Sequence, residues 1–353
     1  VCGHSLEQVR VLGEGGQASV SLCRDTHTGK LLALKTAHKE IHSKEDGEEG
    51  IAQGTRFDIR MEFDTVRFLI ESNVPGIVPA HGMGRDGSTG DLCILMDYCD
   101  GGTLLSELRR RPFRRLSERR AALVLSSLAQ TLEHCHRLGI MHRDVKLENV
   151  LIHHGHAKDD ESLNIDKRRP LRTSKTMHDK DEEEDEYLNG CRFLLADFGL
   201  ACRFTPGHPI YDGCLVGTSE YIAPEMIKGA YDERADVWSL GVLLHLILTG
   251  HFPFHEPQQQ HQRRCSSLVL ARTSACPHKL EMDSSPLYKH LSHGARALIQ
   301  GMLRKDPSRR FSLSAVRSHP WLQSSSTTNI DIRKRCGATG AITPTSFIGA
   351  KRI

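Results

Sequence analysis

Two short polar segments constrain this chain more than any other part of its sequence. The first is His142-Arg143-Asp144-Val145-Lys146-Leu147-Glu148-Asn149, and the second, Asp197-Phe198-Gly199, begins 48 residues after Asn149. Together they supply a carboxylate that can orient a hydroxyl group, a lysine that can neutralise developing phosphate charge, and two side chains of the kind that bind magnesium. Transfer of a phosphoryl group depends on this positioning and electrostatic stabilisation. The fold must therefore bring the two segments together.

A glycine-rich segment near the start of the chain points to the same chemistry. Gly13-Glu14-Gly15-Gly16-Gln17-Ala18-Ser19-Val20 lies between two expected strands, and small residues let backbone amides approach a phosphate closely. A strand rather than a helix after the glycines favours a phosphate-covering hairpin over a dinucleotide-binding fold. Lys35 closes the next expected strand, 15 residues after Val20. An isolated lysine there would be an ordinary surface residue, but this spacing favours a phosphate contact.

With these motifs the chain resembles a eukaryotic-type protein kinase of the serine/threonine class. Three later segments agree with the resemblance, the last of them in the manner of calcium/calmodulin-dependent-type and polo-like kinases. They are Gly217-Thr218-Ser219-Glu220-Tyr221-Ile222-Ala223-Pro224-Glu225, Asp236-Val237-Trp238-Ser239-Leu240-Gly241 and His319-Pro320-Trp321-Leu322. The resemblance implies an α+β, two-lobed protein kinase fold with a small β-rich N-lobe and a larger, mainly α-helical C-lobe. It also implies that Glu225 pairs with Arg310 and that Asp236 braces the catalytic loop.

The resemblance gives a domain plan for residues 6–322. It places the N-lobe at 6–96, the hinge at 97–102 and the C-lobe at 103–322, and it leaves residues 323–353 as a C-terminal tail. Apolar periodicity predicts helices over Phe57–Ile70, Leu116–Leu138 and Val237–Leu248, the last buried in the core. Residues 153–191 are polar, basic and then acidic, and are expected to be a disordered insert. Residues 255–286 are expected to be irregular.

The resemblance also assigns catalytic roles and implies that ATP and Mg²⁺ bind. Asp144 would orient the substrate hydroxyl or accept its proton, and Lys146, which points to serine/threonine substrates, would contact the transferred phosphate. Asn149 and Asp197 would hold magnesium. Lys35 would bind the α- and β-phosphates, paired with a glutamate on the following helix. Glu62 fits that partner best, with Asp64 and Glu71 as alternatives.

The expected nucleotide site combines the glycine loop with an apolar pocket and the hinge. Met96 would be the gatekeeper, and backbone groups of Asp97 and Cys99 would meet the adenine edge. Ala18 replaces the third glycine of the family pattern, which should stiffen the loop slightly. For each apolar residue taken alone, plain core packing is the alternative. The full set is Leu12, Gly13, Gly15, Gly16, Ala18, Val20, Ala33, Met96, Asp97, Cys99 and Leu151.

The activation segment departs from the family pattern at one position. An arginine before the catalytic aspartate, here Arg143, usually pairs with a phosphate three residues before the glycine of Gly217-Thr218. Cys214 occupies that position and cannot carry such a phosphate. We therefore expect activation not to depend on phosphorylation there, with Asp212 supplying part of the charge or Tyr211 acting as another acceptor. Cys202 and Cys214 are expected to be inert thiols rather than a redox pair.

Composition limits the classes of partner and the cellular compartment that we expect. The net charge of +3 favours neither nucleic acid nor a membrane surface, and the basic run 109–115 is interpreted as a solvated helix end, so nucleic acid is not an expected partner. Eleven scattered cysteines without a C-x-x-C pair indicate reduced thiols and an intracellular location, cytoplasmic or nuclear. No apolar stretch approaches the roughly 18 residues of a membrane span. Without an initiator methionine, the chain is expected to be a fragment or a processed form.

Protein substrates bearing serine or threonine are the expected partners. The insert 153–191, with Thr173, Ser174 and Thr176 beside basic residues, is a candidate docking or autophosphorylation segment.

The rival hypothesis is a pseudokinase-type nucleotide-binding scaffold, which the loss of a catalytic residue would favour. None of the expected catalytic residues is lost. A small-molecule kinase is disfavoured by the activation-segment ending, Tyr221 through Glu225.

Overall fold

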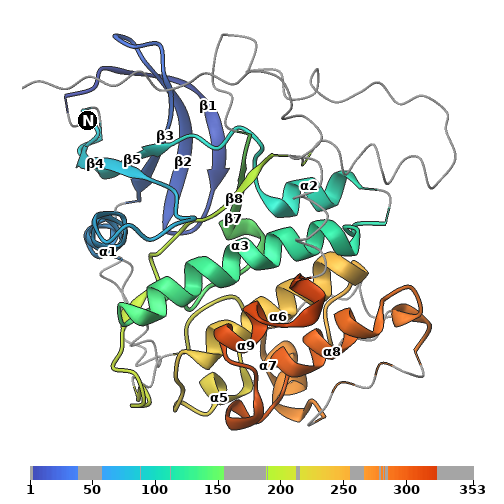
Figure 1. Ribbon diagram of the computed structural model, residues 1–353. Helices are drawn as coiled ribbons and strands as arrows, with labels where there is room; N and C mark the ends of the chain where they lie inside the picture. Colours follow the sequence, from blue (N-terminus) through green and yellow to red (C-terminus); the bar gives the residue numbers. More distant parts are fainter. Residues whose placement is uncertain are drawn as a thin grey trace, which may run out of the picture.

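The structure is a computed structural model that describes residues 3–38, 58–87, 89–111, 113–154, 188, 190–211, 215–254, 266–277, 280, 282 and 285–323. A five-stranded sheet with one helix beside it forms the smaller lobe, and helices form the larger one (Figure 1). Helix α3 crosses the molecule between the sheet and most of the large-lobe helices (Figure 1). The predicted two-lobed α+β fold is confirmed.

The small lobe is built on an antiparallel sheet in the order β1-β2-β3-β5-β4. Its strands are β1 (Leu6–Glu14), β2 (Ala18–Asp25), β3 (Leu31–Ala37), β4 (Ala80–Arg85) and β5 (Leu92–Asp97). Leu32 and Leu34 of β3 pack with Cys23, Cys93 and Leu95 from the two neighbouring strands into one buried cluster. Strand β3 lies in the middle of the sheet, so its residues are fixed from both sides.

Helix α1 (Ile59–Glu71) lies within the predicted range Phe57–Ile70, apart from its last residue, while Phe57 is outside the described residues. The side chain of Asp58 caps its N-terminus by accepting a hydrogen bond from the Arg60 N–H at 2.9 Å. Its buried residues recur with helical spacing and include one charged residue among apolar ones; they are Ile59, Glu62, Val66 and Leu69. The same face that packs the helix therefore carries Glu62 into the interior.

The large lobe is built around two long helices, α3 (Glu118–Arg137) and α6 (Arg234–Thr249). Every residue of α6 from Ala235 to Thr249 is buried, which confirms a core helix. It ends at Gly250, whose φ of 75° is the left-handed conformation that favours glycine. The shorter helices are α2 (Leu104–Arg110), α5 (Pro224–Ile227), α7 (Ser266–Ala275), α8 (His293–Met302) and α9 (Leu313–Arg317). Within the described ranges, no helix is both long and apolar enough to span a membrane.

Two short strand pairs place the functional segments between the lobes. Strand β6 (Ile140–Met141) pairs with β9 (Cys202–Arg203), and β7 (Val150–His153) pairs with β8 (Arg192–Leu195). The segment from His142 to Asn149 thus lies between β6 and β7, and Asp197 to Gly199 lies between β8 and β9. These antiparallel pairs bring together segments that are about 50 residues apart in sequence.

The expectation of an irregular stretch over 255–286 is wrong in part, because residues 266–275 form α7. Its serines and threonine give it weak helix propensity, so the local sequence did not indicate a helix. Thr273 is buried and Leu270 packs against the main core, so tertiary contacts stabilise the helix. Residues 255–265, most of the insert 153–191 and the tail from residue 324 lie outside the described residues.

We predict that buried His245 makes the fold sensitive to acid. Its Nδ1 bonds the His251 carbonyl at 2.8 Å and its Nε2 bonds the Tyr288 hydroxyl at 3.0 Å, and burial lowers the pKa of His245 to about 4. Between pH 6.5 and 4 the unfolded chain binds the extra proton and the folded chain does not. The unfolding free energy should therefore fall by up to about 3 kcal/mol over that range.

Urea unfolding at pH 5 and 7.5 measures this effect. The His245→Asn variant should be less stable at pH 7.5 but lose less stability on acidification than the wild type. The exposed-histidine variant His208→Asn should keep the wild-type pH dependence. Equal pH dependence in wild type and His245→Asn would contradict the assignment.

Candidate active site

The side chain of Lys35 joins three elements of the fold. From β3, its Nζ lies 2.8 and 2.7 Å from the two carboxylate oxygens of Glu62 on α1, and 2.8 Å from Oδ1 of Asp197 after β8. Burial disfavours its charge, but the two carboxylates outweigh burial and raise the pKa of Lys35. For Asp197, burial is likewise opposed by the Lys35 ammonium, which lowers the pKa of that carboxyl. The predicted pairing of Lys35 with Glu62 is confirmed, and the alternatives Asp64 and Glu71 instead contact Arg67.

The segment that carries Asp197 is held in a strained conformation. Asp197 has a φ of 63°, which is uncommon for a residue with a side chain. The next residue, Phe198, is buried and packs edge-on against His142, with ring centroids 4.7 Å apart. His142 Nε2 lies 3.1 Å from the Ala196 carbonyl. Contacts on both sides of Asp197 therefore fix the direction of its carboxylate.

Four polar groups surround the carboxylate of Asp144. Its Oδ1 accepts hydrogen bonds from the Thr218 N–H at 3.1 Å and the Thr218 hydroxyl at 2.8 Å. Its Oδ2 accepts from Lys146 Nζ at 2.6 Å and from Asn149 Nδ2 at 3.1 Å. Lys146 Nζ also reaches the Thr218 hydroxyl at 2.9 Å. The carboxylate, the ammonium and a hydroxyl group thus share one small region.

A buried carboxylate on α6 holds the backbone of this loop. Asp236 accepts hydrogen bonds from the backbone N–H groups of His142 and Arg143, both at 2.9 Å, and its Oδ2 lies 2.8 Å from Nε2 of His136. Burial opposes ionisation, but these partners, His136 first, lower the pKa of Asp236. Arg143 has a φ of 65°, so the loop depends on external bonds to keep its shape. The prediction that Asp236 braces the catalytic loop is confirmed.

The end of the activation segment is anchored to the core of the large lobe. Arg310 and Glu225 form a buried bidentate ion pair, in which Nη2 donates to Oε2 at 2.8 Å. Gly217 has a φ of 102°, and a Cβ there would lie 2.7 Å from the Arg143 carbonyl oxygen. Any larger residue would push Thr218 away from Asp144. The predicted Glu225–Arg310 pair is confirmed.

The guanidinium of Arg143 donates hydrogen bonds to two described groups of the large lobe. Its Nε donates to the Leu200 carbonyl at 2.7 Å, and its Nη1 donates to the buried Tyr231 hydroxyl at 2.9 Å. Cys214 and Asp212 lie outside the described residues, and Tyr211 is exposed. The predictions about these three residues are therefore not tested.

Strand β9 of the activation segment also contacts the helix that carries Glu62. The guanidinium of Arg203 lies over the ring of Phe68 on α1, 4.9 Å from its centroid. Cys202, the neighbour of Arg203, is partly buried, while Cys214 lies outside the described residues, so the expectation of two inert thiols stays a prediction. The Arg203–Phe68 contact links the position of α1 to that of the activation segment.

The residues expected at the adenine lie on neighbouring strands. Ala33 is opposite Met96 in the β3–β5 register, and Val20 is opposite Lys35 in the β2–β3 register. Met96 and Leu151 pack against the apolar cluster that contains Cys99. The glycine loop is open, because a Cβ at Gly13 or Gly16 would meet no atom within 4 Å and Leu12 is exposed. The Gly15 N–H donates a hydrogen bond to the Ala18 carbonyl at 2.9 Å, which closes the turn.

The donor set fits magnesium. Asn149 uses its Nδ2 to bond the Asp144 carbonyl at 2.9 Å, which leaves the side-chain oxygen of Asn149 as an oxygen ligand. The side chain of Asp197 is 43% exposed, although Lys35 beside it is buried. One carboxylate and one amide oxygen are ligands that Mg²⁺ accepts, with phosphate and water oxygens completing its shell.

Comparison with known proteins identifies the family. The model of the protein kinase domain matches residues 6–322. The chain belongs to the protein kinase family. Among curated relatives, calcium-dependent protein kinase 14 of Oryza sativa subsp. japonica is 30% identical over 92% of this chain and 52% of the relative. Calcium-dependent protein kinase 17 of Arabidopsis thaliana is also 30% identical, over the same shares, so the chain spans about half the length of these relatives.

Two residues of this kinase domain were not assigned a role from the sequence. Thr218 bonds both Asp144 and Lys146, and Tyr231 bonds Arg143. Thr218 belongs to the motif Gly217-Thr218, so the sequence marked it as a residue of interest. Its contact with Asp144 could not be predicted, because the two residues are 74 positions apart. Tyr231 lies outside every motif, and its buried hydroxyl could be found only from the fold.

We predict that Asp236→Asn destabilises the kinase domain by roughly 2–4 kcal/mol. The amide would retain one acceptor oxygen but place an NH₂ group against a backbone N–H donor. Urea unfolding at neutral pH measures the loss, with Asp64→Asn as the control because Asp64 is exposed on α1. An unchanged unfolding midpoint for Asp236→Asn would show that the loop does not depend on this carboxylate.

Proposed function

We propose that the chain is an ATP- and magnesium-dependent protein serine/threonine kinase. The observation that carries this proposal is that Lys35 binds Glu62 and Asp197, while Lys146 binds Asp144 and is near enough to Asp197 to help lower its pKa. Each group alone is common, but their convergence from β3, α1 and two loops supplies the charges that phosphoryl transfer requires. The family match supports the same activity.

Lys35 would bind the α- and β-phosphates of ATP, and Glu62 would hold its ammonium in place. Asn149 and Asp197 would hold magnesium, which when bound neutralises negative charge on the phosphates. Lys35 already contacts Asp197, so the phosphate-binding and metal-binding groups are adjacent. The open glycine loop between β1 and β2 would cover the phosphates.

Asp144 would orient the hydroxyl of the protein substrate and accept its proton. The Thr218 hydroxyl, 2.8 Å from Oδ1, shows that a hydroxyl group of this kind reaches the carboxylate. Lys146 contacts both that hydroxyl and the carboxylate, so its charge would lie close to the phosphate that the substrate hydroxyl attacks. This lysine, together with the serine/threonine class of the resemblance, supports serine and threonine as acceptors.

A pseudokinase scaffold remains the alternative. It predicts nucleotide binding without transfer. The contacts of Lys35 with Glu62, of Lys146 with Asp144 and of Asn149 with the Asp144 carbonyl support an enzyme instead. A scaffold that only binds nucleotide needs neither the Lys146–Asp144 contact nor the Asn149 hydrogen bond.

We predict that Asp144→Asn lowers kcat about 10²–10⁴-fold, the usual contribution of a general base, with little change in the KM for ATP. A peptide-array assay with labelled ATP, run on wild type and variant side by side, measures the rate and the acceptor residue. The Asp64→Asn variant should retain wild-type activity. Nucleotide binding without transfer by the wild type would instead support the scaffold.

We further propose that the active state does not require a phosphate at position 214. Leu200 and Tyr231 already bond the guanidinium of Arg143, and Arg203 stacks on Phe68 of α1. These contacts would keep the activation segment and Glu62 in place, as a phosphate does in kinases that need one.

We predict that phosphatase treatment leaves the wild-type rate within about twofold, whereas Tyr231→Phe lowers kcat several-fold because Arg143 loses one hydrogen bond worth about 1 kcal/mol. Steady-state rates before and after treatment, with mass spectrometry of residues 197–225, measure both. A rate that collapses on treatment, with the lost phosphate located in this segment, would contradict the proposal.

A further inference from the structure

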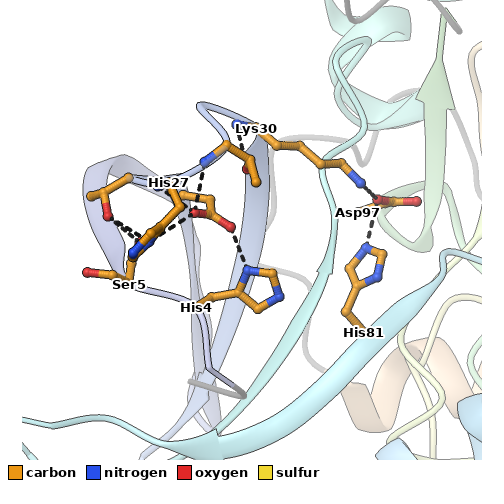
Figure 2. Close-up of polar contacts among 9 residues, drawn as sticks. His4, Ser5, His27, Lys30, His81 and Asp97 are labelled. Atoms are coloured by element: carbon orange, nitrogen blue, oxygen red, sulfur yellow. Dashed lines mark hydrogen bonds and ion pairs between the residues drawn. The ribbon is translucent and has the colours of Figure 1, made fainter.

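A group of three charged or titratable side chains lies at the start of the hinge. The carboxylate of Asp97, the last residue of β5, accepts hydrogen bonds on Oδ1 from Lys30 Nζ and His81 Nε2, each at 2.8 Å (Figure 2). Lys30 directly precedes β3, and His81 belongs to β4. The three side chains therefore connect both strands that flank β5 to the residue where the chain leaves the sheet.

A hydrogen bond and strand pairing also hold the backbone of Asp97 in place. Its N–H donates to the Pro79 carbonyl at 2.9 Å, and its Cα is opposite Leu32 in the β3–β5 register. The N–H is thus already used, and the carbonyl oxygen is the backbone group of Asp97 that would accept a hydrogen bond from the adenine amino group. The direction of this carbonyl group depends on how the peptide after Asp97 is held.

The lysine that binds Asp97 comes from a well-ordered turn. Asp25 accepts hydrogen bonds from the backbone N–H groups of His27 and Thr28 at 2.9 and 3.3 Å, and its other oxygen lies 2.5 Å from Nδ1 of His4 (Figure 2). The Asp25 N–H donates to the Lys30 carbonyl at 2.9 Å. Because both ends of this turn are hydrogen-bonded, the backbone of Lys30 has a fixed position from which its side chain reaches Asp97.

The Asp97 carboxylate remains ionised in this setting. Burial opposes the charge, but the hydrogen bonds from Lys30 and His81 lower the pKa of Asp97. Among described residues, the surface pairs of α1 offer a contrast: Arg67 lies 3.7 and 3.8 Å from Asp64 and Glu71, which are neighbours on one helix. The contacts of Asp97 are shorter and join separate strands, so they constrain the fold more.

We propose that Asp97 is a positioning residue for adenine, whose side chain, bound by Lys30 and His81, fixes the hinge carbonyl that meets the 6-amino group. This inference rests on the ATP-dependent function proposed above. Asp97 acts through its own backbone and does not touch the phosphates, so it affects nucleotide affinity and not the chemical step.

Steady-state kinetics and direct ATP binding test the proposal. The Asp97→Asn and Lys30→Met variants should raise the Kd and KM for ATP about three- to fivefold, in keeping with the modest strength of partly exposed ion pairs, and leave kcat unchanged. Lys30→Arg, which keeps the charge, should restore most of the affinity. Asp64→Asn, which removes an exposed carboxylate of α1, should behave as wild type.

A second nucleotide separates positioning from general loosening of the small lobe. Purine riboside 5′-triphosphate lacks the 6-amino group but keeps the sugar and phosphates. Its Kd should be the same in wild type and Asp97→Asn, so that the two nucleotides bind the variant with a smaller difference in affinity than they bind the wild type.

Two outcomes would overturn the inference alone: an unchanged Kd for ATP in Asp97→Asn, or an equal loss for both nucleotides. A wild-type chain that binds no ATP would overturn the proposed function as well. Because binding is measured separately from turnover, a chain that binds ATP but transfers no phosphate would contradict only the proposed activity, and the Asp97 comparison would still decide the inference.

Discussion

The site depends first on the ammonium of Lys35, which lies between two carboxylates. It is the group through which β3, α1 and the segment after β8 meet, and each of these elements belongs to a different part of the chain. Without it, Glu62 would be a buried carboxylate facing a second carboxylate, which is strongly unfavourable. The same ion cluster therefore has two consequences: it stabilises one relative position of sheet and helix, and it places positive charge where phosphates would bind.

The catalytic loop depends on a different anchor. Asp236 belongs to α6, which is buried along almost its whole length, and it binds the loop through backbone N–H groups rather than through the side chains of Asp144 and Lys146. Asp144 and Lys146 are thus left to interact with each other and with Thr218. The large lobe supplies this base, whereas α1 contacts the activation segment through the cation–π pair of Phe68 and Arg203 and is linked to Asp197 through Lys35. Such a contact is worth only about 0.5–1 kcal/mol at an exposed site, so the buried residues of α1 and its Glu62–Lys35 ion pair contribute more to the position of the helix.

Sequence patterns predicted those parts of the fold whose signals are local or belong to a motif. The expected strands on either side of the glycine-rich segment, the apolar face of α1 and the long apolar run of α6 each marked an element, and the motifs predicted the pairs Lys35–Glu62 and Glu225–Arg310. Helix α7 was missed because packing stabilises it rather than propensity. Strand β4 gave no clear signal, since two of its six residues are glycines. Contacts such as Tyr231 with Arg143 join residues 88 positions apart, and no local pattern encodes them.

Two residues of the site, Arg143 and Asp197, occupy left-handed backbone conformations that L-residues with side chains adopt only at a cost of about 1 kcal/mol or more. Glycine at either position would relieve that strain, yet it would remove a guanidinium or a carboxylate on which the site depends. Local backbone preference and catalytic chemistry thus select different residues at these positions. A glycine would therefore gain an easier backbone conformation but lose the hydrogen bonds of Arg143 to Leu200 and Tyr231, or the ion pair of Asp197 with Lys35, so selection for heat resistance would weigh these two effects against each other.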